Sequence, residues 1–379
     1  MRFVLVARLA MVLAVAAGLG ACAGVPDSAV LHPVAEKAGI GQPVSVLAAT
    51  TRQRSAADPR DFTSEREFGL SYDAYRVSVP PVHVPGEIEW PARLPGDPAK
   101  SFVVTGSQRL DQAGFARDVT RDMKGSGEVI VFVHGYNTSY QEAVFRAAQL
   151  KHDNEIREAM VAFSWPSAAA VTGYLADREA STYSRDYLER TLDGLARMPG
   201  VKRIHIIAHS MGGWLTMETL RQATLRGRSA FLPKLGEVFL ASPDIDVYVF
   251  RTQLDVIGRS TPPITVAISD DDQALGLSQW LAGDVPRVGN IPADLTDAEE
   301  ARKTIARYGL RVINMTKAKG ADPVNHSKFV GLLSTLSQMK RGETQARSGL
   351  LSSTGIFAVD VAGSILQVPF RVGAAIAGR

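Results

Sequence analysis

A serine between an apolar run and a helical pattern is the residue of this sequence best suited to chemistry. The segment IIAHSMGG spans residues 206–213. A nucleophile elbow, which holds a serine in a tight turn between strand and helix, needs small neighbours for close backbone approach. Gly212 meets that need, and Ala208 replaces the usual first glycine. The pattern predicts Ser210 as a nucleophile; the alternative is a serine that only caps an ordinary helix.

A serine nucleophile needs a base, and the order of the chain leaves one histidine for that role. The chain contains seven histidines. Where a nucleophile elbow is used, the triad follows the order serine, acid, histidine. Only His326 lies downstream of Ser210. It falls in a loop between the last expected strand and a helical pattern, so we predict His326 as the base.

The acid of the triad is a choice between two loops. Aspartates occupy positions 270–272, one residue after the apolar run at 264–268. All three cannot be buried against one imidazole, because unpaired buried charge is expensive. Asp272, nearest the following helix, is the predicted acid. Asp244 and Asp246, which follow the preceding strand, are the alternative; their non-catalytic interpretation is a helix cap or a loop turn.

A His-Gly pair at the end of the first strongly apolar run is typical of an oxyanion loop. Gly135 permits an unusual backbone there, and the N–H groups of Tyr136 and Met211 are then the predicted oxyanion-hole donors. Losing one such donor typically costs about 3 kcal/mol of transition-state stabilisation. The neighbouring His134 is predicted to be structural.

The elements that position these residues alternate along the chain. Strands are expected at 44–49, 75–79, 102–105, 129–133, 160–165, 203–208, 237–241, 264–268 and 311–315, and helices at 141–158, 183–197 and 211–226. Helical patterns also follow the last two strands. Continuous apolar β-branched runs are typical of strands buried on both faces. The alternation predicts an α/β fold with a doubly wound, mostly parallel sheet and helices on both faces.

The N-terminus has the pattern of an export signal. Arg2 and Arg8 precede a short apolar run, which ends in LGAC at residues 19–22. That tetrapeptide resembles the bacterial lipobox, which predicts a signal peptide over 1–21 and lipidation of Cys22. Cys22 is the single cysteine of the chain, so no internal disulfide is possible. Ala23, rather than the Asp associated with inner-membrane retention, favours the periplasmic face of the outer membrane.

The remaining boundaries follow from composition. We expect a tether over residues 22–42, a catalytic domain over 43–340 and a Gly-, Ser- and Ala-rich tail over 341–379. The apolar patch at 356–376 is interpreted as a loosely packed helix, as a membrane-proximal element or as a tail without chemical consequence.

Composition excludes several other classes of protein. The chain has 379 residues, 45% of them hydrophobic, and a formal charge of +3. Basic clusters interleaved with aromatics, which would indicate nucleic-acid binding, are not evident. No histidine pair has metal-ligand spacing with acids on one face, since His205 and His209 lie at a strand end. Phosphate-binding glycine motifs are missing too. We therefore predict neither a metal nor a cofactor.

Five short motifs together resemble an uncharacterised bacterial α/β-hydrolase family, whose members are often exported or lipid-anchored. They are HGYNT at 134–138, FSWPS at 163–167, AHSMG at 208–212, PDID at 243–246 and NHS at 325–327. The similarity spans roughly residues 43–335. It implies the α/β-hydrolase fold and serine chemistry, and it supplies no substrate.

The predicted activity is hydrolysis of a carboxylic ester through an acyl-enzyme. A small molecule or a lipid ester of the cell envelope is the expected substrate, because of the predicted membrane anchor. One alternative is an amidase or acyltransferase on the same fold. Another is an envelope lipoprotein without turnover, against which the ordered serine, acid and histidine argue.

Overall fold

The structure, a computed structural model, describes residues 25–35, 40–291, 299–318 and 324–330, together with the backbone of residues 356–359 and 365–367. The predicted signal peptide and Cys22 lie outside the described residues, as do parts of the expected tether and of the tail. Among the helices that are described, none combines the length and apolar character that a bilayer crossing requires.

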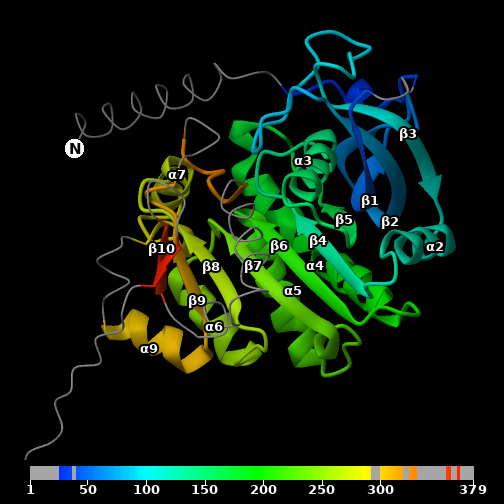
Figure 1. The fold of residues 1–379 in the computed structure, drawn as a ribbon. Helices are drawn as coiled ribbons and strands as arrows, with labels where there is room; N and C mark the ends of the chain where they lie inside the picture. The colour runs from blue at the N-terminus through cyan, green and yellow to red at the C-terminus, as the bar shows by residue number, and fades with distance from the viewer. Residues whose placement is uncertain are drawn as a thin grey trace, which may run out of the picture.

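A single mixed sheet organises the described part of the chain (Figure 1). Its strands are β1 (Gln42–Arg54), β2 (Phe62–Val79), β3 (Val103–Leu110), β4 (Glu128–Val133), β5 (Ala159–Ser164), β6 (Arg203–His209), β7 (Leu235–Ala241), β8 (Ile264–Ile268), β9 (Arg311–Asn314), β10 (Ile356–Val359) and β11 (Ile365–Gln367). They lie in the order β11-β10-β9-β8-β7-β6-β4-β5-β1-β2-β3. From β10 to β1 every neighbouring pair is parallel. β2, β3 and β11 are added antiparallel at the two ends.

Helices alternate with the strands. They are α2 (Gln112–Asp122), α3 (Tyr140–Asp153), α4 (Tyr174–Arg197), α5 (Met211–Arg226), α6 (Val247–Ile257), α7 (Gln273–Leu281) and α9 (Glu299–Tyr308). Short 3₁₀ turns are η1 (Ser28–Leu31), η2 (Val171–Gly173), η3 (Leu232–Lys234) and η4 (Val288–Asn290). Local sequence explains the ends: Ser139 and Glu142 form a capping box at α3, and Gly227, at φ 64°, ends α5.

Two apolar cores cover opposite faces of the sheet. Side chains of α2, α4, α5, α6 and α9 pack on one face, against inward-facing residues such as Val131 and Ile206. The other face is covered by η1, α3 and the segment 324–330, against residues such as Phe132 and Ile207. Alternate residues of β4 and β6 thus enter opposite cores, as expected for central parallel strands. The expected doubly wound α/β fold with helices on both faces is confirmed.

Several expected boundaries differ from the structure. α4 begins at Tyr174, and α3 ends at Asp153 rather than at 158. β2 is much longer than expected. Its first half is polar and largely exposed, so no apolar run in the sequence marks it as a strand. Within the tail, residues 356–359 and 365–367 are strands that extend the sheet beside β9, where a helix had been one interpretation.

Candidate active site

Ser210 occupies the sharp turn between β6 and α5. Its backbone lies at φ 52°, ψ −120°, a conformation that non-glycine residues rarely adopt. The Ser210 amide donates to Ala241 of β7 at 2.9 Å, while its carbonyl accepts from Gly213 and Asp244. Such strain persists only where surrounding contacts hold it, and it is typical of functional sites. The side chain is nearly buried, 3% exposed.

Two glycines allow the backbones around Ser210 to approach closely. A Cβ atom at Gly212 would lie 2.4 Å from the His134 carbonyl oxygen and 2.5 Å from that of Val133. One at Gly135 would lie 3.0 Å from the Ser210 Cβ. Residues 134 and 135 therefore lie against the start of α5. Within the described residues, the N–H groups of Tyr136 and Met211 make no hydrogen bond to another residue.

The structure brings Asp272 and His326 together. His326 Nδ1 lies 2.7 Å from Asp272 Oδ2, and the carboxylate is fully buried. Asp272 Oδ1 accepts from the Leu275 amide and so caps α7. The carboxylate is thereby fixed by the helix start at the same time as it contacts the imidazole.

The segment that contains His326 is fastened beside the Ser210 turn. The Lys328 ammonium donates to both oxygens of Asp271 at 2.7 Å and to the Thr316 carbonyl. The Asn325 amide also donates to Asp271, at 3.1 Å. Two neighbouring aspartates therefore have separate roles: Asp271 holds the loop, and Asp272 contacts the His326 imidazole.

His209 links that segment to the serine turn. Its ring lies 4.5 Å from the His326 ring and stacks at 4.7 Å on Phe329. Its Nε2 is 3.2 Å from the His326 carbonyl oxygen. Burial lowers the pKa of His209 well below its usual value, so at neutral pH this ring is uncharged and donates from Nε2 to that carbonyl.

The alternative acids lie in other contacts. Asp244 is buried and forms an ion pair with Arg287 at 3.3 Å, and it accepts from Tyr174 and Ser278. Asp246 caps α6 by accepting from the amides of residues 248 and 249. The described contacts of these two side chains do not include His326.

The loop at 134–138 is held by two buried charged residues that none of the sequence motifs contains. Asp177, on α4, accepts from the Asn137 amide at 3.1 Å and from Ser167 and Ala168. The Arg52 guanidinium donates to the carbonyls of Thr138 and Ser167. Burial lowers the pKa of Arg52 to about 10, so the group stays charged at neutral pH.

His134 has the structural role expected of it. The ring stacks on Trp165 at 4.8 Å, and the Trp165 indole donates to the His134 carbonyl. Its Nε2 lies 3.2 Å from the Ser164 hydroxyl. Burial lowers the pKa of His134 to about 3, which keeps it neutral and unsuited to act as a base at neutral pH.

No local pattern in the sequence identifies Arg52 or Asp177. An arginine that interrupts the apolar run of β1 and an aspartate in the first turn of a helix are both ordinary surface features. Their burial is a consequence of packing between β1, β5 and α4. The signal available in the sequence is weak: the seven residues before Arg52, at 45–51, are all uncharged.

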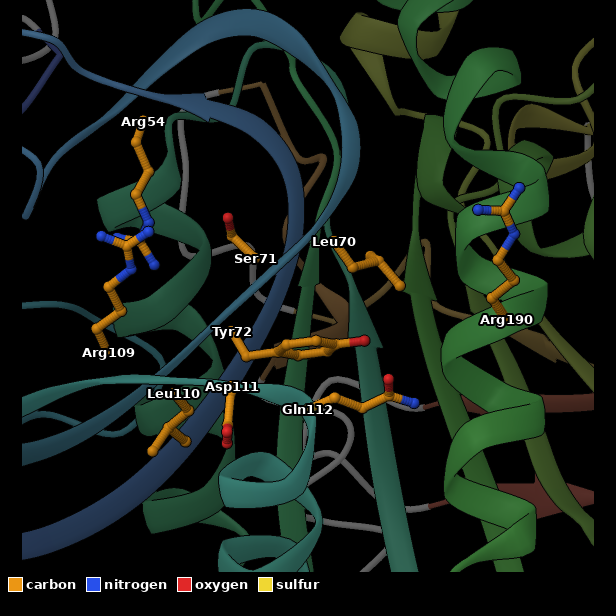
Figure 2. A pocket seen from close by; sticks show the side chains of 9 residues that line it. All are labelled: Arg54, Leu70, Ser71, Tyr72, Arg109, Leu110, Asp111, Gln112 and Arg190. Atoms are coloured by element: carbon orange, nitrogen blue, oxygen red, sulfur yellow. The ribbon is translucent and has the colours of Figure 1, made fainter.

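A separate cavity of about 740 Å³ lies between β2, β3, α2 and α4 (Figure 2). Arg54 and Arg109 lie on one side of it and Arg190 on the other, with Tyr72 between them. The Arg54 guanidinium is paired with Asp73 at 2.7 Å. None of the predicted catalytic residues lines this cavity.

Comparison with known protein families also indicates an α/β hydrolase. A family model described as "Alpha/beta hydrolase of unknown function (DUF900)" matches residues 110–340. No curated protein matches the chain significantly.

The solved structures that match this chain are distant from it in sequence and in structure. Est1E from Butyrivibrio proteoclasticus has 13% identity and a TM-score of 0.35, over 58% of this chain and 89% of its own. Inhibited esterase B from Lactobacillus rhamnosis has 12% identity and a TM-score of 0.32, over 69% and 89%. Carboxyl esterase 2 from Tuber melanosporum has 11% identity and a TM-score of 0.32, over 92% and 87%.

Proposed function

The chain belongs to a family of α/β hydrolases of unknown function, and we propose that it is a serine hydrolase of carboxylic esters. The observation that supports this most directly is the Asp272–His326 contact of 2.7 Å. His326 lies in a segment that packs against His209, and His209 directly precedes Ser210, whose backbone is strained. A nucleophile, a base and a group that orients the base are the three parts that acyl transfer by serine requires.

In the proposed first step, His326 Nε2 takes the proton of the Ser210 hydroxyl while Ser210 Oγ attacks the ester carbonyl carbon. Asp272 holds Nδ1–H and stabilises the imidazolium that forms. The carbonyl π electrons move onto oxygen, which the N–H groups of Tyr136 and Met211 stabilise. His326 then returns the proton to the departing alcohol oxygen as the ester bond breaks.

The acyl-enzyme is resolved by water in the reverse sense. His326 removes a proton from water, hydroxide oxygen attacks the acyl carbon, and Ser210 leaves with the proton from His326. Asp177 and Arg52 support this chemistry by holding the loop of Tyr136, not by contacting the substrate.

We infer from the LGAC segment at 19–22 that the protein is lipidated at Cys22 and acts at the periplasmic face of the outer membrane. A lipid or acylated envelope component is then the proposed substrate. The anchor would place the enzyme beside such esters, which is the support for this choice.

A fluorophosphonate probe tests the nucleophile. We expect the probe to label the wild type and not Ser210→Ala, while circular dichroism shows both to be folded. His326→Ala should also lose labelling, since an unassisted serine hydroxyl is a poor nucleophile at neutral pH. Ser107→Ala, at an exposed serine of β3, is the control that should keep labelling. Equal labelling of wild type and Ser210→Ala would refute the proposal.

A further inference from the structure

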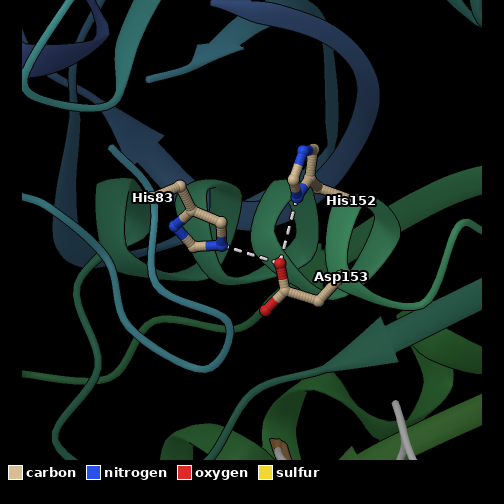
Figure 3. A group of neighbouring side chains, drawn as sticks. All are labelled: His83, His152 and Asp153. Atoms are coloured by element: carbon tan, nitrogen blue, oxygen red, sulfur yellow. Dashed lines mark hydrogen bonds and ion pairs between the residues drawn. The ribbon is translucent and has the colours of Figure 1, made fainter. Parts of the chain in front are cut away.

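Two histidines and an aspartate from separate parts of the chain meet on the α3 face of the sheet. His83 follows β2, and His152 and Asp153 end α3. His83 Nε2 lies 2.7 Å and His152 Nδ1 3.1 Å from the same oxygen of Asp153 (Figure 3). The three possible ligand atoms all lie within 4.8 Å of one another. Sequence spacing could not reveal this group, because folding alone brings His83 to α3.

Each of the three side chains is oriented from behind by another residue. His83 Nδ1 lies 2.8 Å from Glu89 Oε2, and His152 Nε2 lies 3.1 Å from Gln42 Oε1. The second oxygen of Asp153 accepts from the Gly86 amide at 2.7 Å. Histidines that bind metals almost always donate their other ring N–H to a carboxylate or carbonyl, which fixes the tautomer. Here both histidines are oriented in that manner.

The group is largely shielded from water, so its charges need compensation. The side chains of His83 and Asp153 are 4% and 1% exposed, and that of His152 is 23% exposed. The His83 ring lies between two carboxylates, with Glu89 at 2.8 Å from Nδ1 and Asp153 at 2.7 Å from Nε2. The buried Asp153 and the half-buried Glu89 thus place two negative charges around His83, and a divalent cation bound to Asp153 would offset that charge.

We propose that His83, His152 and Asp153 bind a zinc ion that joins the loop after β2 to the end of α3. Imidazole nitrogens and a carboxylate are zinc ligands, with a water molecule in the fourth position. Bonds of about 2.0–2.1 Å in tetrahedral directions separate ligand atoms by about 3.3 Å. Zinc therefore requires the Asp153 oxygen to move about 0.6 Å farther from His83 Nε2 and about 0.2 Å farther from His152 Nδ1, and it replaces the protons on these two nitrogens.

The site is separate from the proposed catalytic residues. His152 lies at the opposite end of α3 from residues 134–138, and the 14-residue helix is about 21 Å long. Zinc would thus stabilise the fold, holding the proline-rich stretch after β2 against α3 and the start of β1.

A second histidine-acid group provides a matched control. His32 lies 3.0 Å from Asp61 and 3.8 Å from Asp58. It offers a single imidazole, and Asp58 is already paired with Arg60 at 2.5 Å. Zinc affinity should therefore depend on His152 and not on His32.

Calorimetric titration of the full chain with zinc chloride, after treatment with a chelator, tests the proposal. We expect one equivalent to bind at pH 7.5, with binding weakened below pH 6 as the histidines become protonated. At 100 times Kd, zinc should raise Tm by about 5 °C. His152→Ala should lower affinity at least 100-fold and Gln42→Leu about 10-fold, while His32→Ala leaves it unchanged.

Cobalt(II) gives a readout that does not depend on variants. Bound by two imidazoles and a carboxylate in tetrahedral geometry, it should produce intense visible absorption that zinc abolishes. Absence of binding to the wild type would overturn the proposal. Equal zinc affinity of wild type and His152→Ala, or loss of affinity in His32→Ala, would overturn it too, because the ion would then be bound elsewhere.

Discussion

At the scale of single residues, Asp272 has two tasks that one substitution separates. One carboxylate oxygen caps α7 and the other contacts His326. Asparagine caps helices as well as aspartate does, so Asp272→Asn should cost little stability. Its amide N–H would face His326 Nδ1 and favour the wrong tautomer, which costs about 10⁴-fold in rate in serine proteases. We therefore expect turnover of a model ester to fall by about that factor while Tm is nearly unchanged.

Asp246→Asn is the matched control for that substitution, because Asp246 also caps a helix and does not contact His326. It should retain most of the turnover. If Asp246→Asn lost as much activity as Asp272→Asn, the acid would have to be sought in the loop after β7.

His134 makes a pH prediction at the same scale. Burial lowers its pKa to about 3 from an unfolded value of 6.5. Between these values the unfolded chain binds a proton that the native chain does not, so stability falls as pH falls. The contribution is about 1.4 kcal/mol per pH unit. His134→Gln should make the pH dependence of the free energy of unfolding shallower by about that amount between pH 6.5 and 4.5, measured by urea titration. An unchanged slope would contradict this pKa.

At the scale of elements, the approach of α5 to the end of β4 depends on Gly212. A Cβ there would meet two backbone carbonyl oxygens at about 2.5 Å, and backbone atoms cannot move aside as a flexible side chain does. Gly212→Ala should therefore displace the start of α5, lowering Tm by several degrees and turnover by more than 10-fold.

Gly194→Ala is the control for this change of element packing. Gly194 lies within α4, and a Cβ atom there meets nothing within 4 Å. Alanine should raise stability by about 0.5–1 kcal/mol, because glycine is a poor helix former. The Tm of both variants, measured by thermal unfolding, tests the two predictions. A lower Tm for Gly194→Ala would show that alanine destabilises these helices even where its Cβ meets no other atom.

The elements also show how far the sequence predicts this fold. Runs such as VIVFV at 129–133 can be assigned as strands because both their faces are buried. α5 was expected at 211–226 and lies there. The first half of β2 has no such signal, since it is polar and half-exposed. Asp272 and His326, both named from the order of the chain, lie 2.7 Å apart, and their catalytic role stays a prediction. The places of Arg52 and Asp177 depend on long-range packing that local patterns do not encode.

At the scale of the whole molecule, the proposed catalytic residues gather at one edge of the parallel sheet. Ser210, Asp272 and His326 follow β6, β8 and β9, and the loop of Tyr136 follows β4. The carboxyl ends of parallel strands share an edge, so residues distant in sequence meet there. The proposed zinc ion would instead stabilise the α3 face. Metal removal should then change Tm more than it changes the rate per folded molecule.

Attachment to a membrane is the last property of the whole molecule that a single residue should decide. Each buried methylene of an acyl chain contributes about 0.8 kcal/mol, and a single chain anchors only marginally, so firm attachment needs several chains.

If Cys22 is the lipidated residue, a fatty-acid analogue should label the wild type and not Cys22→Ser. The variant should move to the soluble fraction and still hydrolyse a water-soluble ester at the wild-type rate, because Cys22 lies far outside residues 110–340 that match the hydrolase family. Cys22→Ala should behave identically, which separates loss of the thiol from any effect of serine. Absence of label from both wild type and variants would show that the segment before residue 23 is an ordinary cleaved signal, and the proposed envelope substrate would then lose its main support.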